Sequence, residues 1–320
     1  MSELLRELDE MPLSLLEIEA DGLHEVLGGP TLIHLQGARE PALFVCVLMH
    51  GNETSGWDAI RKVLHDHLDS EGFRLPRSLS LFIGNTEAAQ RGVRHLSGQP
   101  DYNRVWPGSE THGTPEHELM RAVMDRMADR EIFASIDLHN NTGLNPHYAC
   151  VNVLEHQSLH LAALFGRTVV YFIRPRGVAS MAMAALGPSV TLECGKVGQE
   201  RGVDHASDYL RACLHLSEIP SHPVAGHDID LYHTVAIVRV PPEQPFAFDN
   251  EENVIRFPRD LDKMNFRELP AGSLIAEYNS APELPLDVRD EQDRQVTESY
   301  FALEDGCVVT RVPVMPSMLT

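Results

Sequence analysis

Two histidines and a glutamate at the ends of apolar segments are the residues of this chain best suited to hold a metal ion. His50 and Glu53 follow the apolar run 42–49, and His139 ends a second run at 133–139. Two neutral imidazoles and one carboxylate are a common ligand set of catalytic zinc, with the fourth position left open for water. The set predicts one Zn²⁺ per chain. The alternative is that each histidine only caps its strand or faces solvent, as a single strand-end histidine usually does.

A third apolar run, 190–194, contains a carboxylate near its end. In an open α/β sheet, ligands bind beyond the carboxyl ends of the strands. If the three runs are neighbouring strands, Glu193 lies close to the metal ligands and can act as a general base and acid. The alternative is a surface ion pair with Lys196. Gly51, between His50 and Glu53, is expected to allow a sharp turn that brings both side chains inward.

A loop rich in glycine, proline and asparagine, 91–108, carries Arg91, Arg94 and Arg104. Arginines are scarce in this acidic chain, so three in one loop indicate binding of a carboxylate or an oxyanion. The alternative is a solvated charged loop, because most exposed arginines only interact with water.

The elements that must position these residues alternate between short apolar runs and helical periodicity. Apolar strands separated by helices are typical of an α/β fold with a mixed, mainly parallel sheet flanked by helices. The predicted strands are 31–36, 42–49, 79–84, 133–139, 148–153, 168–173 and 190–194. The predicted helices are 54–68, 116–130, 157–166 and 203–216.

The pattern changes near residue 222, where prolines become frequent and helical periodicity ends. Short β-like runs follow at 231–240, 272–278 and 299–309. We therefore predict two domains, a catalytic α/β domain at 1–222 and a smaller C-terminal all-β domain at 223–320.

The composition restricts the partners and the compartment. With 26 basic and 47 acidic residues, the formal net charge of −21 disfavours binding to nucleic acid or to a membrane surface. Five cysteines without a CxxC spacing, no secretory signal and no apolar stretch long enough to span a bilayer predict a cytoplasmic protein. The oligomeric state, including a homo-oligomer, is left open.

Four short motifs together resemble the succinylglutamate desuccinylase/aspartoacylase family of the zinc carboxypeptidase clan. They are HGNE at 50–53, NTEAAQRGVR at 85–94 with DYNR at 101–104, DLHN at 137–140 and ECGK at 193–196. They occur in the family's order and cover residues 42–215. The resemblance implies a zinc carboxypeptidase-like fold whose C-terminal β domain shapes the active-site cleft. It also implies zinc-dependent hydrolysis of the amide bond of a small N-acyl amino acid.

The resemblance assigns roles position by position. The zinc-ligand positions are occupied by His50, Glu53 and His139. Glu193 matches the general base, and Arg94 matches the arginine that polarises the scissile carbonyl. Asp137, two residues before His139, is a candidate for orienting that imidazole.

The substrate-binding positions match the family in part. Asn103 and Arg104 match the pair that holds the α-carboxylate of the substrate. Where the aspartoacylase branch has an arginine for the substrate's side-chain carboxylate, ten residues before the general base, this chain has Met183. Either Arg174 or Arg176 replaces that arginine, or the pocket takes a less charged group.

Two other functions stay open at this point. One is a metallocarboxypeptidase acting on short peptides, and the other is an inactive metal-binding homologue. The presence of Glu193 and Arg94 beside a full ligand set favours the deacylase.

Overall fold

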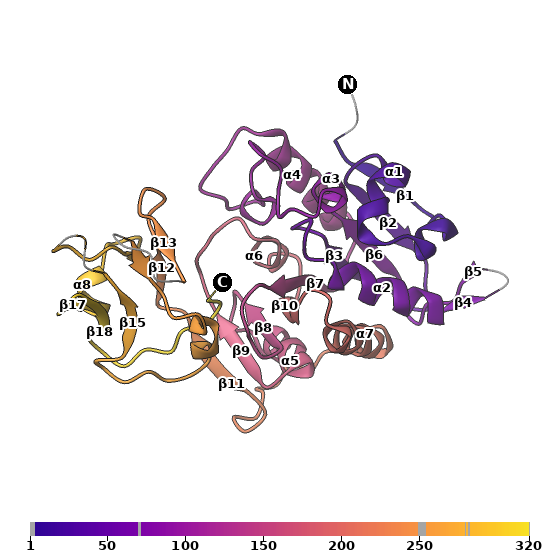
Figure 1. Cartoon of the computed structure of the whole chain (residues 1–320). Coiled ribbons are helices and arrows are strands. Elements are labelled where there is room, and N and C mark those ends of the chain that lie inside the picture. The colour runs from indigo at the N-terminus through magenta and orange to yellow at the C-terminus, as the bar shows by residue number, and fades with distance from the viewer. Residues whose placement is uncertain (1–3, 70–71, 249–253, 279, 281, 320) are drawn as a thin grey trace. The chain divides into compact units, whose positions relative to one another are not determined.

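The protein consists of two compact units. The computed structural model describes residues 4–69, 72–248, 254–278, 280 and 282–319. The first unit comprises Met1–Asn141 and His147–His233, and the second comprises Thr142–Pro146 and Thr234–Thr320 (Figure 1). The predicted division at 222/223 lies eleven residues before the end of the first unit. The difference arises because β11 (Asp230–His233) pairs with β9 (Thr168–Tyr171) and extends the sheet of the first unit.

Within the described residues, the first unit is built on a nine-stranded sheet in the order β1-β2-β6-β3-β7-β10-β8-β9-β11. Six of the eight neighbouring pairs are parallel, and only β2–β6 and β8–β10 are antiparallel. The predicted mixed, mainly parallel sheet is therefore confirmed. The other strands are β1 (Arg6–Leu8), β2 (Thr31–Leu35), β3 (Ala42–Val47), β6 (Leu79–Ile83), β7 (Ile132–Asn141), β8 (Tyr148–Val151) and β10 (Ser189–Lys196).

Helices cover both faces of this sheet (Figure 1). On one face, Trp57 of α2 and Leu210 of α7 pack in a cluster with Val45 of β3. On the other face, Met120 of α4 packs with Phe44, which points away from Val45 because successive strand residues alternate. Burial on both faces explains why the strands read as continuous apolar runs. The helices are α1 (Leu23–Leu27), α2 (Ser55–Asp66), α3 (Thr86–Gln90), α4 (Pro115–Ala128), α5 (His156–Phe165), α6 (Ala179–Met183) and α7 (Glu200–His215).

The second unit is mainly β-structure with its own small core. It contains a pair, β12–β16, and a five-stranded sheet in the order β13-β14-β15-β18-β17. The run at 231–240, predicted as one strand, is divided between β11 of the first unit and β12 (Ala236–Arg239) of the second. The remaining elements are β13 (Phe246–Ala247), β14 (Ile255–Arg256), β15 (Leu274–Glu277), β16 (Asp287–Asp290), α8 (Thr297–Tyr300), β17 (Phe301–Glu304) and β18 (Cys307–Thr310).

None of the helices in the described part of the chain has both the length and the apolar character needed to cross a membrane.

Candidate metal centre

The loop between β3 and α2 carries His50 and Glu53. Leu48, directly after β3, is buried and has a positive φ of 57°. The predicted turn is present, since Glu53 N donates to the carbonyl of His50 at 3.1 Å, and Gly51 is needed there for a second reason. A Cβ on Gly51 would lie 2.2 Å from the nitrogen of Ala89 and 2.3 Å from the carbonyl carbon of Ala88, in α3. The close approach of α3 therefore requires glycine here.

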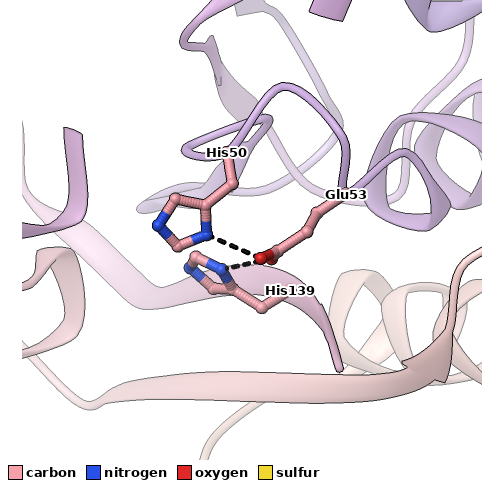
Figure 2. Close-up of side chains that lie close together, drawn as sticks. All are labelled: His50, Glu53 and His139. Atoms are coloured by element: carbon pink, nitrogen blue, oxygen red, sulfur yellow. Dashed lines mark hydrogen bonds and ion pairs between the residues drawn. The ribbon is translucent and has the colours of Figure 1, made fainter. Parts of the chain in front are cut away.

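The side chains of His50, Glu53 and His139 converge (Figure 2). The Nδ1 atoms of His50 and His139 each lie 2.8 Å from a carboxylate oxygen of Glu53, Oε1 and Oε2 respectively. One ligand atom from each residue lies within 4.8 Å of the other two. The residues are only 3%, 7% and 4% exposed, in chain order. Two nitrogens and a carboxylate from buried side chains are a donor set that could hold a metal ion.

A carboxylate fixes the second nitrogen of each ring. Asp137 Oδ2 lies 2.8 Å from His139 Nε2, and Asp101 Oδ1 lies 2.9 Å from His50 Nε2. Each ring therefore lies between two carboxylates, with its Nδ1 toward Glu53 and its Nε2 toward an aspartate. Metal-binding histidines are usually held in this way.

The Nδ1 atom of His50 points toward Glu53 and is a candidate metal ligand. It is buried, and no other described residue forms a well-aligned hydrogen bond with it, although Glu53 Oε1 lies 2.8 Å away. A buried nitrogen without a donor is costly unless another group uses its lone pair. The donor set of two imidazole nitrogens and one carboxylate fits a divalent metal ion.

The charges of the clustered residues shift one another's pKa values. Burial raises the pKa of Glu53, but His139 and His50 outweigh burial and hold this pKa well below its usual range. Burial lowers the pKa of His139, but the charges of Asp137 and Glu53 reverse the shift and raise it well above its usual value. Glu53 and His139 therefore each stabilise the charged form of the other.

Asp101 is the supporting residue that the sequence reasoning missed. Besides holding His50, its Oδ2 accepts hydrogen bonds from Arg94 Nε and Nη2 at 3.2 and 2.9 Å. Arg94 Nη1 in turn lies 3.1 Å from Glu53 Oε1, so the guanidinium borders the metal cluster. The available signal was the position of Asp101 in the DYNR motif, two residues before Asn103.

Glu193 lies on the strand next to His139. The register of β10 and β7 pairs Glu193 with His139, so both side chains lie on the same face of the sheet. Burial raises the pKa of Glu193 to about 8; the charge of His139 opposes this shift, and the charges of Glu53 and Asp137 add to it. A carboxyl group with such a pKa can both accept and return a proton near neutral pH.

The predicted α-carboxylate pair lies beside this cluster. The buried amide of Asn103 places Nδ2 3.1 Å from His139 Nε2 and 3.4 Å from Asp137 Oδ2, and its Oδ1 accepts a hydrogen bond from Ala179 N at 2.8 Å. Arg104 is partly exposed and donates from Nη1 to the carbonyl of Asn103 at 2.6 Å. Asn103 thus supports Asp137, and its binding of substrate together with Arg104 stays a prediction.

The predicted side-chain subsite lies on the segment that precedes α6. Gly177 packs on the Arg104 loop, where Trp106 N donates to its carbonyl at 3.1 Å. Arg174 forms an ion pair with Glu110 at 2.8 Å, and Arg176 is exposed. Met183 is fully buried in the hydrophobic cluster with Phe44. Binding of substrate by Arg174 or Arg176 stays a prediction.

A known family model matches a large part of the first unit. The model of the succinylglutamate desuccinylase/aspartoacylase catalytic domain matches residues 39–217. No protein of curated function matches the chain significantly.

Solved structures similar to the chain share its fold at low identity. Succinylglutamate desuccinylase from Chromobacterium violaceum is 18% identical, with 88% of this chain and 86% of that chain covered and a TM-score of 0.53. A succinylglutamate desuccinylase/aspartoacylase from Rhodobacter sphaeroides is 16% identical, with 88% and 81% covered and a TM-score of 0.54. The product-bound ectoine utilization protein EutE (DoeB) from Ruegeria pomeroyi is 18% identical, with 88% of each chain covered and a TM-score of 0.51.

Proposed function

The chain belongs to the succinylglutamate desuccinylase/aspartoacylase family, since the catalytic-domain match spans 179 of its 320 residues. From this premise we propose that it is a zinc-dependent deacylase. The proposed reaction is hydrolysis of the amide bond of an N-acyl amino acid, which releases a carboxylate and an amine. One observation carries the proposal. His50, Glu53 and His139 converge in one buried cluster, and Glu193 lies on the adjacent strand on the same face.

The proposed cofactor is one Zn²⁺ per chain, held by Nδ1 of both histidines and by the carboxylate of Glu53. Zinc held by such a set supplies Lewis acidity toward a water molecule and a carbonyl oxygen. Asp101 and Asp137, which lie against the two Nε2 atoms, would keep the two rings in the tautomer whose Nδ1 lone pair can bind the metal.

Glu193 is proposed to take the proton of the attacking water and to deliver it to the leaving amine. The group must be ionised for the first transfer, so activity should rise with pH through its pKa. A divalent cation held by the neighbouring cluster would lower this pKa from about 8, because a nearby positive charge favours the carboxylate. The operating value would then lie closer to neutral pH.

Two arginines are proposed to interact with the substrate's oxygen atoms. Arg94 borders the cluster through Glu53, where a guanidinium can stabilise the negative charge that develops on the carbonyl oxygen. Arg104, with Asn103, is proposed to hold the α-carboxylate, since a guanidinium can bind a carboxylate through two parallel hydrogen bonds. Arg174 or Arg176 would contact the substrate's side chain.

Metal analysis combined with a substrate panel tests the proposal. The purified protein should contain about one zinc per chain, and a chelator should abolish hydrolysis of at least one N-acyl amino acid. His139→Ala should lose metal and activity together, whereas His65→Ala, a partly exposed histidine of α2, should keep both. Hydrolysis confined to short peptides would identify a carboxypeptidase instead. Full metal occupancy in His139→Ala would contradict the proposed ligand set.

A further inference from the structure

Asn141 contacts the carboxylate of Glu193 and is the last residue of β7. Its Nδ2 lies 2.6 Å from Glu193 Oε2, and the residue is only 6% exposed. No other described residue forms a hydrogen bond with the Glu193 carboxylate. The same Nδ2 lies 3.4 Å from the hydroxyl of Tyr148. Tyr148 belongs to β8, the other neighbour of β10, and is the register partner of Glu193 in that strand.

An irregularity in β10 brings Asn141 to Glu193. The register pairs Glu193 with His139 and then Lys196 with Asn141, so β10 advances three residues while β7 advances two. The extra residue is accommodated around Gly195, whose φ of +80° suits glycine. Asn140 Nδ2 fixes this bulge by donating to the carbonyl of Gly195 at 2.8 Å.

Two consecutive asparagines thus hold the two carboxylates of the site. The backbone N–H of Asn140 donates to Glu53 Oε2 at 3.0 Å, and the side chain of Asn141 donates to Glu193 Oε2. Glu193 must be ionised to take a proton from water, and an ionised carboxylate can only accept hydrogen bonds, so the amide nitrogen of Asn141 is the atom that can hold it in that state. Oε2 is therefore held in place, and Oε1 is left as the oxygen that can exchange a proton.

The oxygen of the Asn141 amide gives a second argument. Asn141 Oδ1 is buried and has no hydrogen-bond partner among the residues described. A buried acceptor without a donor costs stability. Asn152, by comparison, has both halves of its amide paired, with Phe172 and Ser180.

We propose that Asn141 is a positioning residue for the general base, which holds Glu193 Oε2 so that Oε1 performs both proton transfers. The inference rests on the proposed deacylase function, because it takes Glu193 as the base. It adds a residue to that mechanism and requires no substrate contact by Asn141.

Replacement of Asn141 should lower kcat and leave substrate binding and metal content unchanged. Asn141→Leu, of similar size, should lose about 10- to 100-fold in kcat, the range for one hydrogen bond to a charged group. KM should change by less than about threefold, and zinc should stay near one per chain. Asn141→Ser should recover part of kcat, because a hydroxyl can also donate. Asn152→Leu, a buried amide without contact to Glu193, should lower the melting temperature and leave kcat unchanged.

A double-mutant cycle separates positioning from general support of the fold. In a protein that already carries Glu193→Gln, adding Asn141→Leu should change the residual kcat by less than about twofold, because the base it positions is absent. A full additional loss, or a loss of zinc in Asn141→Leu, would overturn the proposal. If Asn141→Leu does not fold, the same cycle with Asn141→Ser decides.

A measurement without substrate tests the inference independently of the reaction. In ¹⁵N-labelled zinc-loaded protein, one side-chain amide proton of Asn141 should resonate downfield and should move upfield on Glu193→Gln. An unchanged resonance would refute the contact. If wild-type protein hydrolyses no N-acyl amino acid, the proposed function fails, and this resonance still decides whether Asn141 holds Glu193.

Discussion

Asp137 offers the most direct test of how the site is built, because it contacts His139 and needs no substrate to report its effect. Its side chain is fully buried, and its Oδ2 receives the hydrogen bond from His139 Nε2 at 2.8 Å. Asp137→Asn keeps the shape of the side chain and removes its charge. The perturbation therefore acts on His139 without creating a cavity.

The expected loss of zinc affinity is about 10- to 100-fold, which is typical when the partner of a metal-binding histidine is removed. This corresponds to about 1.4–2.7 kcal/mol, since each tenfold change is about 1.4 kcal/mol. The loss has two causes: the imidazole becomes a weaker ligand, and its ring is no longer fixed by an ionised acceptor.

The size of the loss should depend on pH in a defined direction. Asp137 and Glu53 raise the pKa of His139 well above its usual value, so in the wild type zinc must displace a proton from this ring. Below this pKa, affinity falls about tenfold per pH unit. Asp137→Asn lowers the pKa of His139 and reduces this competition. The variant's deficit should therefore be largest at alkaline pH and should shrink as the pH falls.

The assay is competition with a chromophoric zinc chelator across that pH range, with proton release followed by calorimetry. Asp58→Asn, which removes a carboxylate of α2 that pairs with Arg61, serves as the matched control and should bind zinc like the wild type. An equal deficit at every pH would refute the proton competition. Unchanged affinity would refute the role of Asp137 in holding His139.

Three further predictions concern the base, the substrate and the loop. Glu193→Gln should retain zinc but lose at least about 100-fold in kcat, because an amide cannot take the proton; near wild-type turnover would remove Glu193 from the mechanism. Arg104→Ala should lose about 30- to 150-fold in kcat/KM on an N-acyl amino acid and much less on its amide, because only the former has the carboxylate. An equal loss on both substrates would assign Arg104 to the fold. Gly51→Ala should cost about 1–3 kcal/mol in the free energy of unfolding, since its Cβ would meet the α3 backbone, whereas Gly29→Ala has open space and should cost less than 1 kcal/mol.

The sequence predicted best those features that depend only on a residue and its neighbours along the chain. The inner strands of the central sheet, such as β3 and β6, are apolar runs that are buried along their whole length, so their positions can be read without knowing their partners. His50, Glu53 and His139 could be singled out because each stands at or just after the end of such a run. The structure then brings all three together, since β3 and β7 are adjacent and parallel.

The supporting contacts were harder to predict because they depend on distances between segments. Asp101 reaches His50 from a loop 51 residues away in the chain, and Asn141 reaches Glu193 only because β10 has an extra residue. Neither the path of the loop nor the bulge in β10 produces a periodic pattern in the sequence. The contact of Gly51 with α3 was not predicted for the same reason, because α3 is remote in sequence.

The sequence by itself determined the sheet class and the donor set of the site, because hydrophobic periodicity and side-chain chemistry are local properties. Only the tertiary structure decided which nitrogen of each histidine faces the cluster and which asparagine holds which carboxylate. It also decided that β11 belongs to the first unit, because strand pairing depends on hydrogen bonds to β9. An alternating run such as 231–240 can satisfy its backbone in either sheet, so its own residues do not specify its partner.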